Sequence, residues 1–71
     1  MYEAKADVTG LVWKIMAQVG QVIAPGDTLM ILESMKMEIP VVAEDGGTLK
    51  ELRVTEGMSI TEGQVVAVLE G

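Results

Sequence analysis

The sequence predicts an all-β fold, a flattened barrel or sandwich whose two halves are related by a pseudo-two-fold axis. Three observations predict it. The chain repeats itself, its apolar residues fall in short runs between glycine-containing turns, and no segment gives a convincing helix. Because 71 residues suffice for one small core, we expect residues 1–71 to form a single domain.

The repeat emerges when the sequence is shifted by 37 residues and laid on itself. Six of 24 aligned positions are then identical without a gap, and three of the six are glycines. We infer an internal duplication in which both halves follow one structural plan. The identical pairs are Gly10 with Gly47, Gly20 with Gly57, Ile23 with Ile60, Gly26 with Gly63, Leu32 with Leu69, and Glu33 with Glu70.

Each half opens with a strand, "GLVWKIMA" from residue 10 and "GTLKELRV" from residue 47. The apolar positions are 12, 15 and 17 in the first half and 49, 52 and 54 in the second. A step of three followed by a step of two departs from strict alternation, which predicts a β-bulge in both strands. Since Trp13 aligns with Lys50, we expect the Trp13 side chain to face outward and to be partly exposed.

Two turns follow each first strand. Pro25-Gly26 has the residues of a type II turn, in which proline fixes φ at the second position and glycine supplies a positive φ at the third. The duplication places Gly63 at the same position of the second half, and it pairs Gly20 with Gly57 at the preceding turn. We therefore expect positive φ values among these glycines.

The segment "LMILESMKME" contains good helix formers, but its duplicate "VVAVLEG" is rich in β-branched valine. Because one duplicated unit should have one structure, we predict a strand at residues 28–33, a tight turn near 35–36, and a strand at 38–43. Pro40 has no N–H to donate, so the latter strand should be an edge or bulged strand.

The paired halves also predict the core and the place of one lysine. Lys36 is the middle residue of the chain, so the pseudo-symmetry puts it at one end of the fold and the two termini at the other. The aligned apolar positions are expected to form the core. They are Val12, Ile15, Leu29, Ile31, Leu49, Leu52, Val66 and Val68.

Composition excludes several function classes. The net charge of −6 disfavours nucleic-acid binding. The chain has no cysteine and no histidine, so we expect no disulfide, no metal site and no catalytic residue. Glu44-Asp45 is interpreted as part of a solvated turn rather than as an acid–base pair. No apolar run approaches the roughly 20 residues that span a bilayer, so we expect a cytoplasmic protein with no membrane partner.

The central lysine lies in the segment "ESMKME", residues 33–38. Lysine combines a flexible four-carbon stem with an amine, which suits a covalently loaded arm on a hairpin tip. Met35 and Met37 would offer a modifying enzyme an adaptable apolar patch. An ordinary structural role for the methionines is the alternative, but their position at the midpoint of a duplicated β fold favours modification of Lys36.

The residues Glu33-Ser34-Met35-Lys36-Met37 resemble the E-A-M-K-M signature of biotinyl domains. The "PGD" turn at residues 25–27 and the closing "GQVVAVLE" at 63–70 extend the resemblance over nearly the whole chain, nearest to the small biotin/lipoyl attachment proteins. Ser34 stands where alanine is commoner, and the inserted thumb loop of some biotinyl domains is absent. The resemblance implies two four-stranded antiparallel sheets, biotin in amide linkage to Lys36, and recognition through the flanking Glu33, Ser34, Met35 and Met37.

The resemblance further implies a carrier rather than an enzyme. The expected partners of this chain are a biotin protein ligase and the biotin carboxylase and carboxyltransferase components of a carboxylase. We expect the chain to be a monomer. The alternatives are a lipoyl or dual carrier of a 2-oxoacid dehydrogenase or glycine cleavage system, and an unmodified interaction domain. Lipoyl domains usually have aspartate before the lysine and alanine after it, so Met35 and Met37 argue for biotin.

Overall fold

The computed structural model describes residues 1–71, which form eight β-strands and no helix. The all-β prediction is therefore confirmed. None of the chain forms a helix of the length and hydropathy that crossing a membrane would need. The strands are β1 (Tyr2–Lys5), β2 (Gly10–Ile15), β3 (Val22–Ile23), β4 (Thr28–Ser34), β5 (Met37–Val42), β6 (Gly47–Leu52), β7 (Ser59–Ile60) and β8 (Val65–Glu70).

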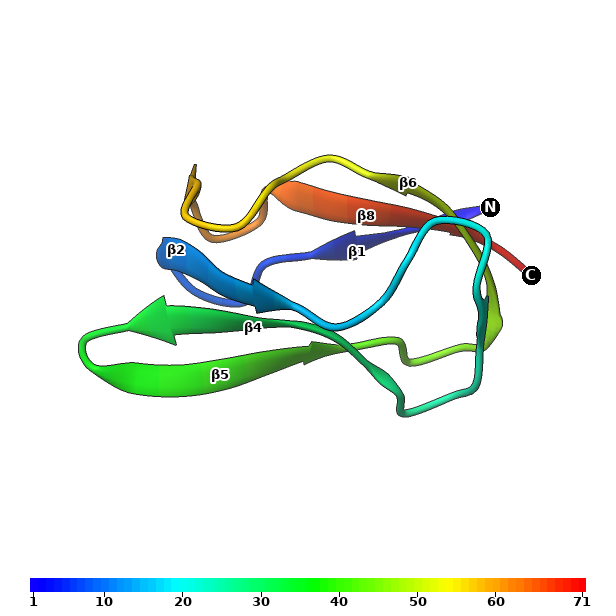
Figure 1. Ribbon diagram of the computed structural model, residues 1–71, viewed down its shortest axis with the longest axis horizontal. Coiled ribbons are helices and arrows are strands. Elements are labelled where there is room, and N and C mark those ends of the chain that lie inside the picture. The colour runs from blue at the N-terminus through cyan, green and yellow to red at the C-terminus, as the bar shows by residue number, and fades with distance from the viewer.

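The strands form two four-stranded antiparallel sheets, which pack face to face as a flattened sandwich (Figure 1). One sheet has the order β1-β8-β6-β3 and the other has the order β5-β4-β2-β7. Each strand of the first half occupies in its sheet the position that its duplicate occupies in the opposite sheet. The duplicated pairs are β2 with β6, β3 with β7, and β4 with β8. The internal symmetry that the repeat predicts is present in the topology.

Strands β2 and β6, which open the two duplicated halves, both contain the predicted β-bulge. The register of β2 against β4 shifts between Val12 and Lys14, and the register of β6 against β8 shifts between Leu49 and Glu51. The extra residue is therefore Trp13 in one half and its aligned partner Lys50 in the other. The Trp13 side chain faces outward and is 47% exposed, as expected from that alignment.

The paired turn glycines adopt the backbone that the sequence predicts. Gly20, Gly26, Gly57 and Gly63 have φ values of 94°, 88°, 87° and 87°. Each turn is closed by a hydrogen bond between the residues that flank it; Asp27 N donates to Ala24 O at 3.0 Å, for example. Positive φ at the third position is the mark of a type II turn, so the turn interpretation is confirmed.

Replacing Gly26 or Gly63 by alanine should destabilise the fold by a modest and similar amount. An added Cβ would meet no heavy atom within 4 Å at either position, so the cost comes from the left-handed backbone alone, about 1 kcal/mol. Urea unfolding measures it. Glu62→Ala, a change at the neighbouring exposed turn position, is the matched control and should shift stability by less than about 0.5 kcal/mol. Equal stability of Gly63→Ala and the unsubstituted chain would contradict the turn assignment.

The core agrees with the predicted set only in part. Val12, Leu29, Leu49 and Val66 are completely buried in the cluster between the sheets, whereas Ile15 and Leu52 are half-buried against it. Ile31 and Val68 lie outside that cluster, although Val68 is only 8% exposed. The core residues that the prediction missed on β4 and β8 are Met30, Leu32, Ala67 and Leu69.

A further bulge, in β4, explains why the predicted core set differs from the observed one. The register of β5 against β4 shifts between Thr28 and Met30, so Leu29 is the extra residue. Beyond it the inward positions become Met30 and Leu32, and Ile31 turns outward. A strict alternation counted from Leu29 therefore places Ile31 on the wrong face, whereas Val68 is buried as predicted, although it lies outside the main cluster.

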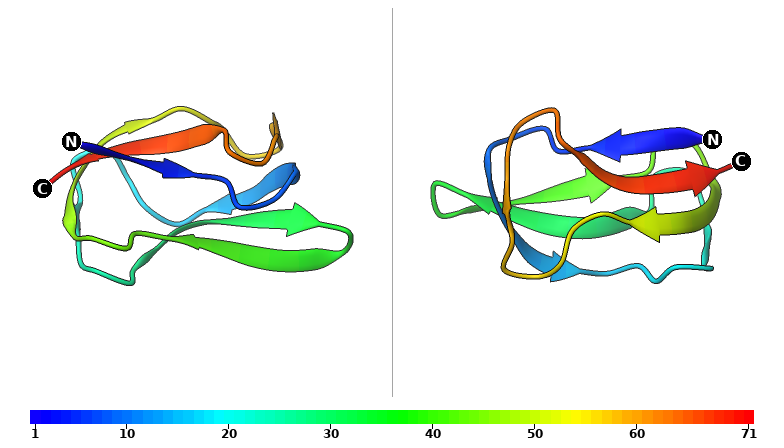
Figure 2. Two further views of the ribbon diagram at one scale, coloured as in Figure 1. Left: turned by 180° about the vertical axis from the view of Figure 1, so that it is seen from behind. Right: turned by 90° about the horizontal axis from the view of Figure 1, so that it is seen from above.

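The hairpin of β4 and β5 and the chain termini lie at opposite ends of the sandwich, as predicted. Figures 1 and 2 show both termini together at one end and the β4–β5 turn projecting at the other. β5 is an edge strand of its sheet, and Pro40 pairs there with Ile31 of β4. An edge strand tolerates the missing N–H of proline, so the sequence expectation for Pro40 is confirmed.

Candidate functional site

The projecting turn consists of two residues, Met35 and Lys36. Ser34 pairs with Met37, so the strands close directly below them. Both turn residues have positive φ, 51° for Met35 and 65° for Lys36. A two-residue hairpin loop with positive φ at both positions is a type I′ turn, whose twist matches that of the flanking strands. The predicted strand, tight turn and strand are confirmed to within one residue.

These two residues are unusual for such a turn. Type I′ turns favour asparagine and glycine, because a Cβ in the left-handed region costs roughly 1–2 kcal/mol per residue. Met35 and Lys36 both carry long side chains there. Strained backbone of this kind is concentrated at functional sites, where the side chain is needed in that place.

Replacing Met35 by asparagine should therefore stabilise the domain. Asparagine tolerates the left-handed region and retains a side chain, so we expect an increase of about 0.5–1 kcal/mol in the free energy of unfolding. Urea titration followed by tryptophan fluorescence measures it. The same change at Met37, a strand residue, should give no gain. A Met35→Asn protein less stable than the unsubstituted chain would contradict the strain.

The turn exposes its side chains fully. Met35 is 92% exposed and Met37 is 63% exposed, and Lys36 between them is also exposed. The two ion pairs of the structure involve other cations, Lys50 with Glu70 at 3.6 Å and Arg53 with Glu51 at 3.2 Å. Neither an ion pair nor a hydrogen bond holds the Lys36 amine against the domain, so the side chain extends freely into solvent.

The base of the hairpin, by contrast, is anchored. The Ser34 hydroxyl donates a hydrogen bond to the carbonyl oxygen of Thr9 at 2.9 Å, and the Thr9 hydroxyl accepts one from the Glu62 N–H at 3.0 Å. Gly10 approaches the hairpin so closely that a Cβ there would overlap with the Glu33 carbonyl oxygen. The tip therefore projects from a fixed base rather than from a loose loop.

The five residues singled out from the sequence are brought together in this hairpin, with different surroundings. Lys36, Met35 and Met37 form the open tip, whereas Glu33 and Ser34 are half-buried at its base. The hydrogen bond to Thr9 gives Ser34 an anchoring contact that the sequence does not reveal. From the sequence, Ser34 could be interpreted only as a small residue standing where alanine is commoner. Nothing in the sequence indicates a contact with Thr9.

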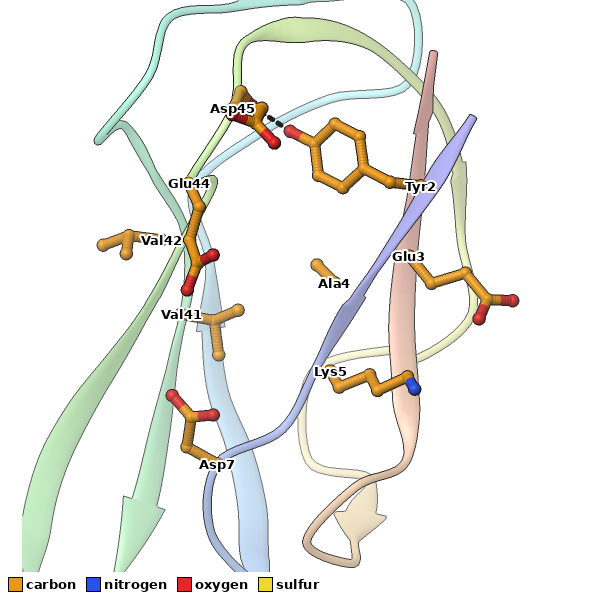
Figure 3. A pocket seen from close by; sticks show the side chains of 9 residues that line it. All are labelled: Tyr2, Glu3, Ala4, Lys5, Asp7, Val41, Val42, Glu44 and Asp45. Carbon is orange, nitrogen blue, oxygen red and sulfur yellow. Dashed lines mark hydrogen bonds between the residues drawn. The ribbon is translucent and has the colours of Figure 1, made fainter. Parts of the chain in front are cut away.

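A groove that was not predicted from the sequence runs between the edge strands β1 and β5 (Figure 3). This groove has a volume of about 430 Å³ and includes no residue of the hairpin tip. Tyr2 closes one end by donating a hydrogen bond from its hydroxyl to the Asp45 carbonyl. Partial burial, and then the negative charges of Asp45 and Glu44, raise the pKa of the Tyr2 phenol above its usual value. The phenol therefore stays neutral and remains a donor at physiological pH.

Comparison with known proteins identifies the fold and the family. The profile of the biotin/lipoyl family, described as "Biotin-requiring enzyme", matches residues 3–69. The biotin/lipoyl attachment protein of Bacillus subtilis is 44% identical over 62 residues, which are 87% of this chain and 85% of that protein. The biotinylated protein TB7.3 homolog of Mycobacterium leprae is 37% identical over 67 residues, 94% of each chain.

A solved structure shows the same architecture. The urea carboxylase of Kluyveromyces lactis superposes with a TM-score of 0.92 at 32% identity, over 97% of this chain and 6% of that enzyme. The matches thus include small proteins of similar length and one segment of a large carboxylase. On this evidence the chain belongs to the biotin/lipoyl attachment family and is a carrier domain rather than a catalyst.

Proposed function

We propose that this chain is a biotin carrier in which the Lys36 side chain is biotinylated and delivers the cofactor to the active sites of a carboxylase. The observation that carries the proposal is the exposure of Lys36 at the apex of a type I′ turn, between the open side chains of Met35 and Met37. The relatives support it, since one is named as a biotinylated protein and another is a urea carboxylase.

Attachment forms one amide bond. The neutral Lys36 amine attacks the acyl carbon of a biotinyl-adenylate, a C–N bond forms, the bond from that carbon to the phosphate oxygen breaks, and AMP leaves while the nitrogen loses a proton. No side chain of this domain contacts the Lys36 amine as a hydrogen-bond or ion-pair partner, so this domain supplies no base. The biotin protein ligase must therefore remove the proton and supply the activated acyl group.

The loaded arm then acts by position rather than by chemistry. Acylation replaces the ammonium with a neutral amide and lengthens an already flexible side chain, so the ring can reach an active site that the domain itself does not enter. Biotin carboxylase and carboxyltransferase components would in turn add and remove the carboxyl group. Tethering holds the ring at high effective concentration near both.

Lipoate is the second candidate cofactor, because the Bacillus relative is named for both groups. Co-expression with a biotin ligase, with a lipoate ligase, and with both together would decide between them by intact mass. The proposal requires the increment of one biotinyl group in the first and third cultures. A single lipoyl increment in the third culture would support the lipoyl carrier, and an unchanged mass in all three would support the unmodified interaction domain.

The two tip methionines should matter for recognition more than for stability. Met35→Ala and Met37→Ala remove exposed apolar contacts without touching the core, so unfolding should change by less than about 0.5 kcal/mol while biotinylation by the ligase slows severalfold. Initial rates of biotin incorporation measure the effect. Met16→Ala and Met58→Ala are matched controls, because those methionines are 50% and 41% exposed but are not part of the tip formed by Met35, Lys36 and Met37. Equal rates for all four variants would contradict a recognition role.

A further inference from the structure

The outer faces of the two sheets differ in chemistry although the duplication relates them. On the sheet that carries the hairpin, the outward side chains of β2, β4 and β5 include Leu11, Trp13, Ile31, Pro40 and Val42, which we call the hairpin-sheet face. The aligned residues on the other sheet are, in the same order, Thr48, Lys50, Val68, Glu3 and Lys5. Three apolar residues of the hairpin-sheet face thus correspond to charged residues.

The hairpin-sheet face is left open to solvent. Trp13 is 47% exposed, Val42 is 43% exposed and Leu11 is 37% exposed. Figure 3 shows the Val42 side chain directed away from the groove, whereas Val41 is directed inward. Together with Ile31 and Pro40 they spread over three adjacent strands, β2, β4 and β5. The same face carries Lys14, which pairs with Ile31, and Glu33 and Glu38 in the row of Leu11.

The aligned face of the other sheet is covered by charged side chains. The ion pairs of Lys50 with Glu70 and of Arg53 with Glu51 involve β6 and β8 of that sheet. Val68, which pairs with Glu51 on that sheet, is only 8% exposed, whereas the aligned Ile31 is half-buried. Long charged side chains cover apolar surface with their stems, and neither ion pair of the structure lies on the hairpin-sheet face.

The fold does not require this difference. Trp13 and Lys50 occupy the same extra position of equivalent bulges, and the backbone accepts either residue. An exposed tryptophan at a position where lysine serves the fold equally well indicates a binding role, since tryptophan is among the residues that contribute most to protein interfaces.

Charge argues for a partner other than a second copy of the chain. The net charge of −6 makes two copies repel, and Glu33 and Glu38 face each other across the hairpin at the border of this face. The single positive charge of Lys14, beside Trp13, does not offset the two negative charges of these carboxylates. The complementary surface is therefore apolar at its centre and carries lysine or arginine toward the hairpin.

We infer that the hairpin-sheet face is the surface on which the carrier docks against the carboxylase component that acts on its biotin; this rests on the proposed function. Strands β4 and β5 contribute Ile31, Pro40 and Val42 to this face, and the turn that joins them carries Lys36. A ligase must reach the Lys36 amine itself and therefore the tip. A carboxylase receives a ring at the end of a long arm, so its contact with the carrier extends from the tip onto the body of the hairpin sheet.

The duplication supplies the test variant. The double variant Leu11→Thr, Trp13→Lys replaces two residues of the hairpin-sheet face with those found at the aligned positions 48 and 50. Val42→Lys makes the corresponding replacement on β5, with the residue found at position 5. The probe is Kluyveromyces lactis urea carboxylase from which the segment matching this chain is deleted, supplied with urea, bicarbonate, ATP and the separately biotinylated chain. Urea-dependent ATP hydrolysis should show a KM for the double variant raised about tenfold with kcat nearly unchanged. Val42→Lys should raise KM in the same direction.

The matched control is Lys50→Trp, which places tryptophan on the opposite face and should leave KM unchanged. Failure of the unsubstituted biotinylated chain to restore turnover overturns the part of the proposed function that concerns delivery of biotin to a carboxylase. Turnover by that chain with the same KM for both face variants overturns the docking surface alone. If the ligase biotinylates the double variant about tenfold more slowly than the unsubstituted chain, the face binds the ligase instead. If sedimentation shows a dimer that forms only when the face is unsubstituted, the face binds a second copy of the chain. Either result overturns the inference.

Discussion

Lys36→Arg protein is expected to incorporate no biotin and to remain folded. Arginine keeps the positive charge and the long side chain at the apex of the turn, but its guanidinium is not deprotonated in proteins and cannot be acylated as the amine is. Lys36 makes no ion pair, so the free energy of unfolding should change by less than about 0.5 kcal/mol. A streptavidin mobility shift after co-expression with a biotin ligase, together with urea unfolding, measures both quantities.

The other lysines provide matched controls for this result. Lys14→Arg and Lys50→Arg alter exposed lysines of the two bulged strands and should leave biotin incorporation complete. Lys50→Arg also preserves the charge that pairs with Glu70. Streptavidin binding that persists in Lys36→Arg, or that disappears in Lys14→Arg, would contradict the assignment of the attachment residue.

Gly10→Ala is expected to be the most damaging single methyl group that can be added to this chain. The new Cβ would overlap with the Glu33 carbonyl oxygen and press on the Ser34 Cα, both of them backbone atoms of β4. Overpacking against backbone costs about 3 kcal/mol or more, against a total stability on the order of 3–5 kcal/mol for a domain of this size. Most of the protein should therefore be unfolded at 37 °C, as thermal unfolding by circular dichroism would show.

Two other glycines test whether this loss is steric. Gly47→Ala, the aligned position of the second half, brings a Cβ to 2.6 Å from the Glu70 carbonyl oxygen and should be damaging for the same reason. Gly26→Ala adds the same methyl group in open space and should cost only about 1 kcal/mol. If Gly10→Ala is no less stable than Gly26→Ala, the close approach of β2 to the hairpin is wrong.

The duplication made most of the fold predictable, because each half constrains the interpretation of the other. Residues 29–38 have helix-forming composition, yet they form β4, the turn and the start of β5. Their buried pairing with both neighbouring strands overrides local propensity. Trp13 could likewise be placed outside because its aligned residue is a lysine, and the turn glycines could be paired with one another.

The features that escaped prediction depend on backbone register and on contacts distant in sequence. The bulge at Leu29 reverses the alternation that follows it, so Ile31 faces outward and Met30 enters the core. The anchoring of Ser34 to Thr9 joins residues 25 apart, and the groove between β1 and β5 arises where two edge strands from different halves meet. None of these leaves a periodic trace in the sequence. The proposed attachment residue, Lys36, could be singled out because its chemistry, midpoint position and flanking methionines coincide with a resemblance of residues 33–37 to the biotinyl signature.

The proposed function depends most directly on which amine carries the cofactor. Peptide-level mass spectrometry of the unsubstituted chain, co-expressed with a biotin ligase and kept folded until digestion, locates the modification. We expect one biotinyl group, on the peptide that contains Lys36, and none on the peptides that contain Lys5, Lys14 or Lys50. Biotin on any of those three lysines, or an unmodified Lys36 in protein that binds streptavidin, would contradict the proposed function.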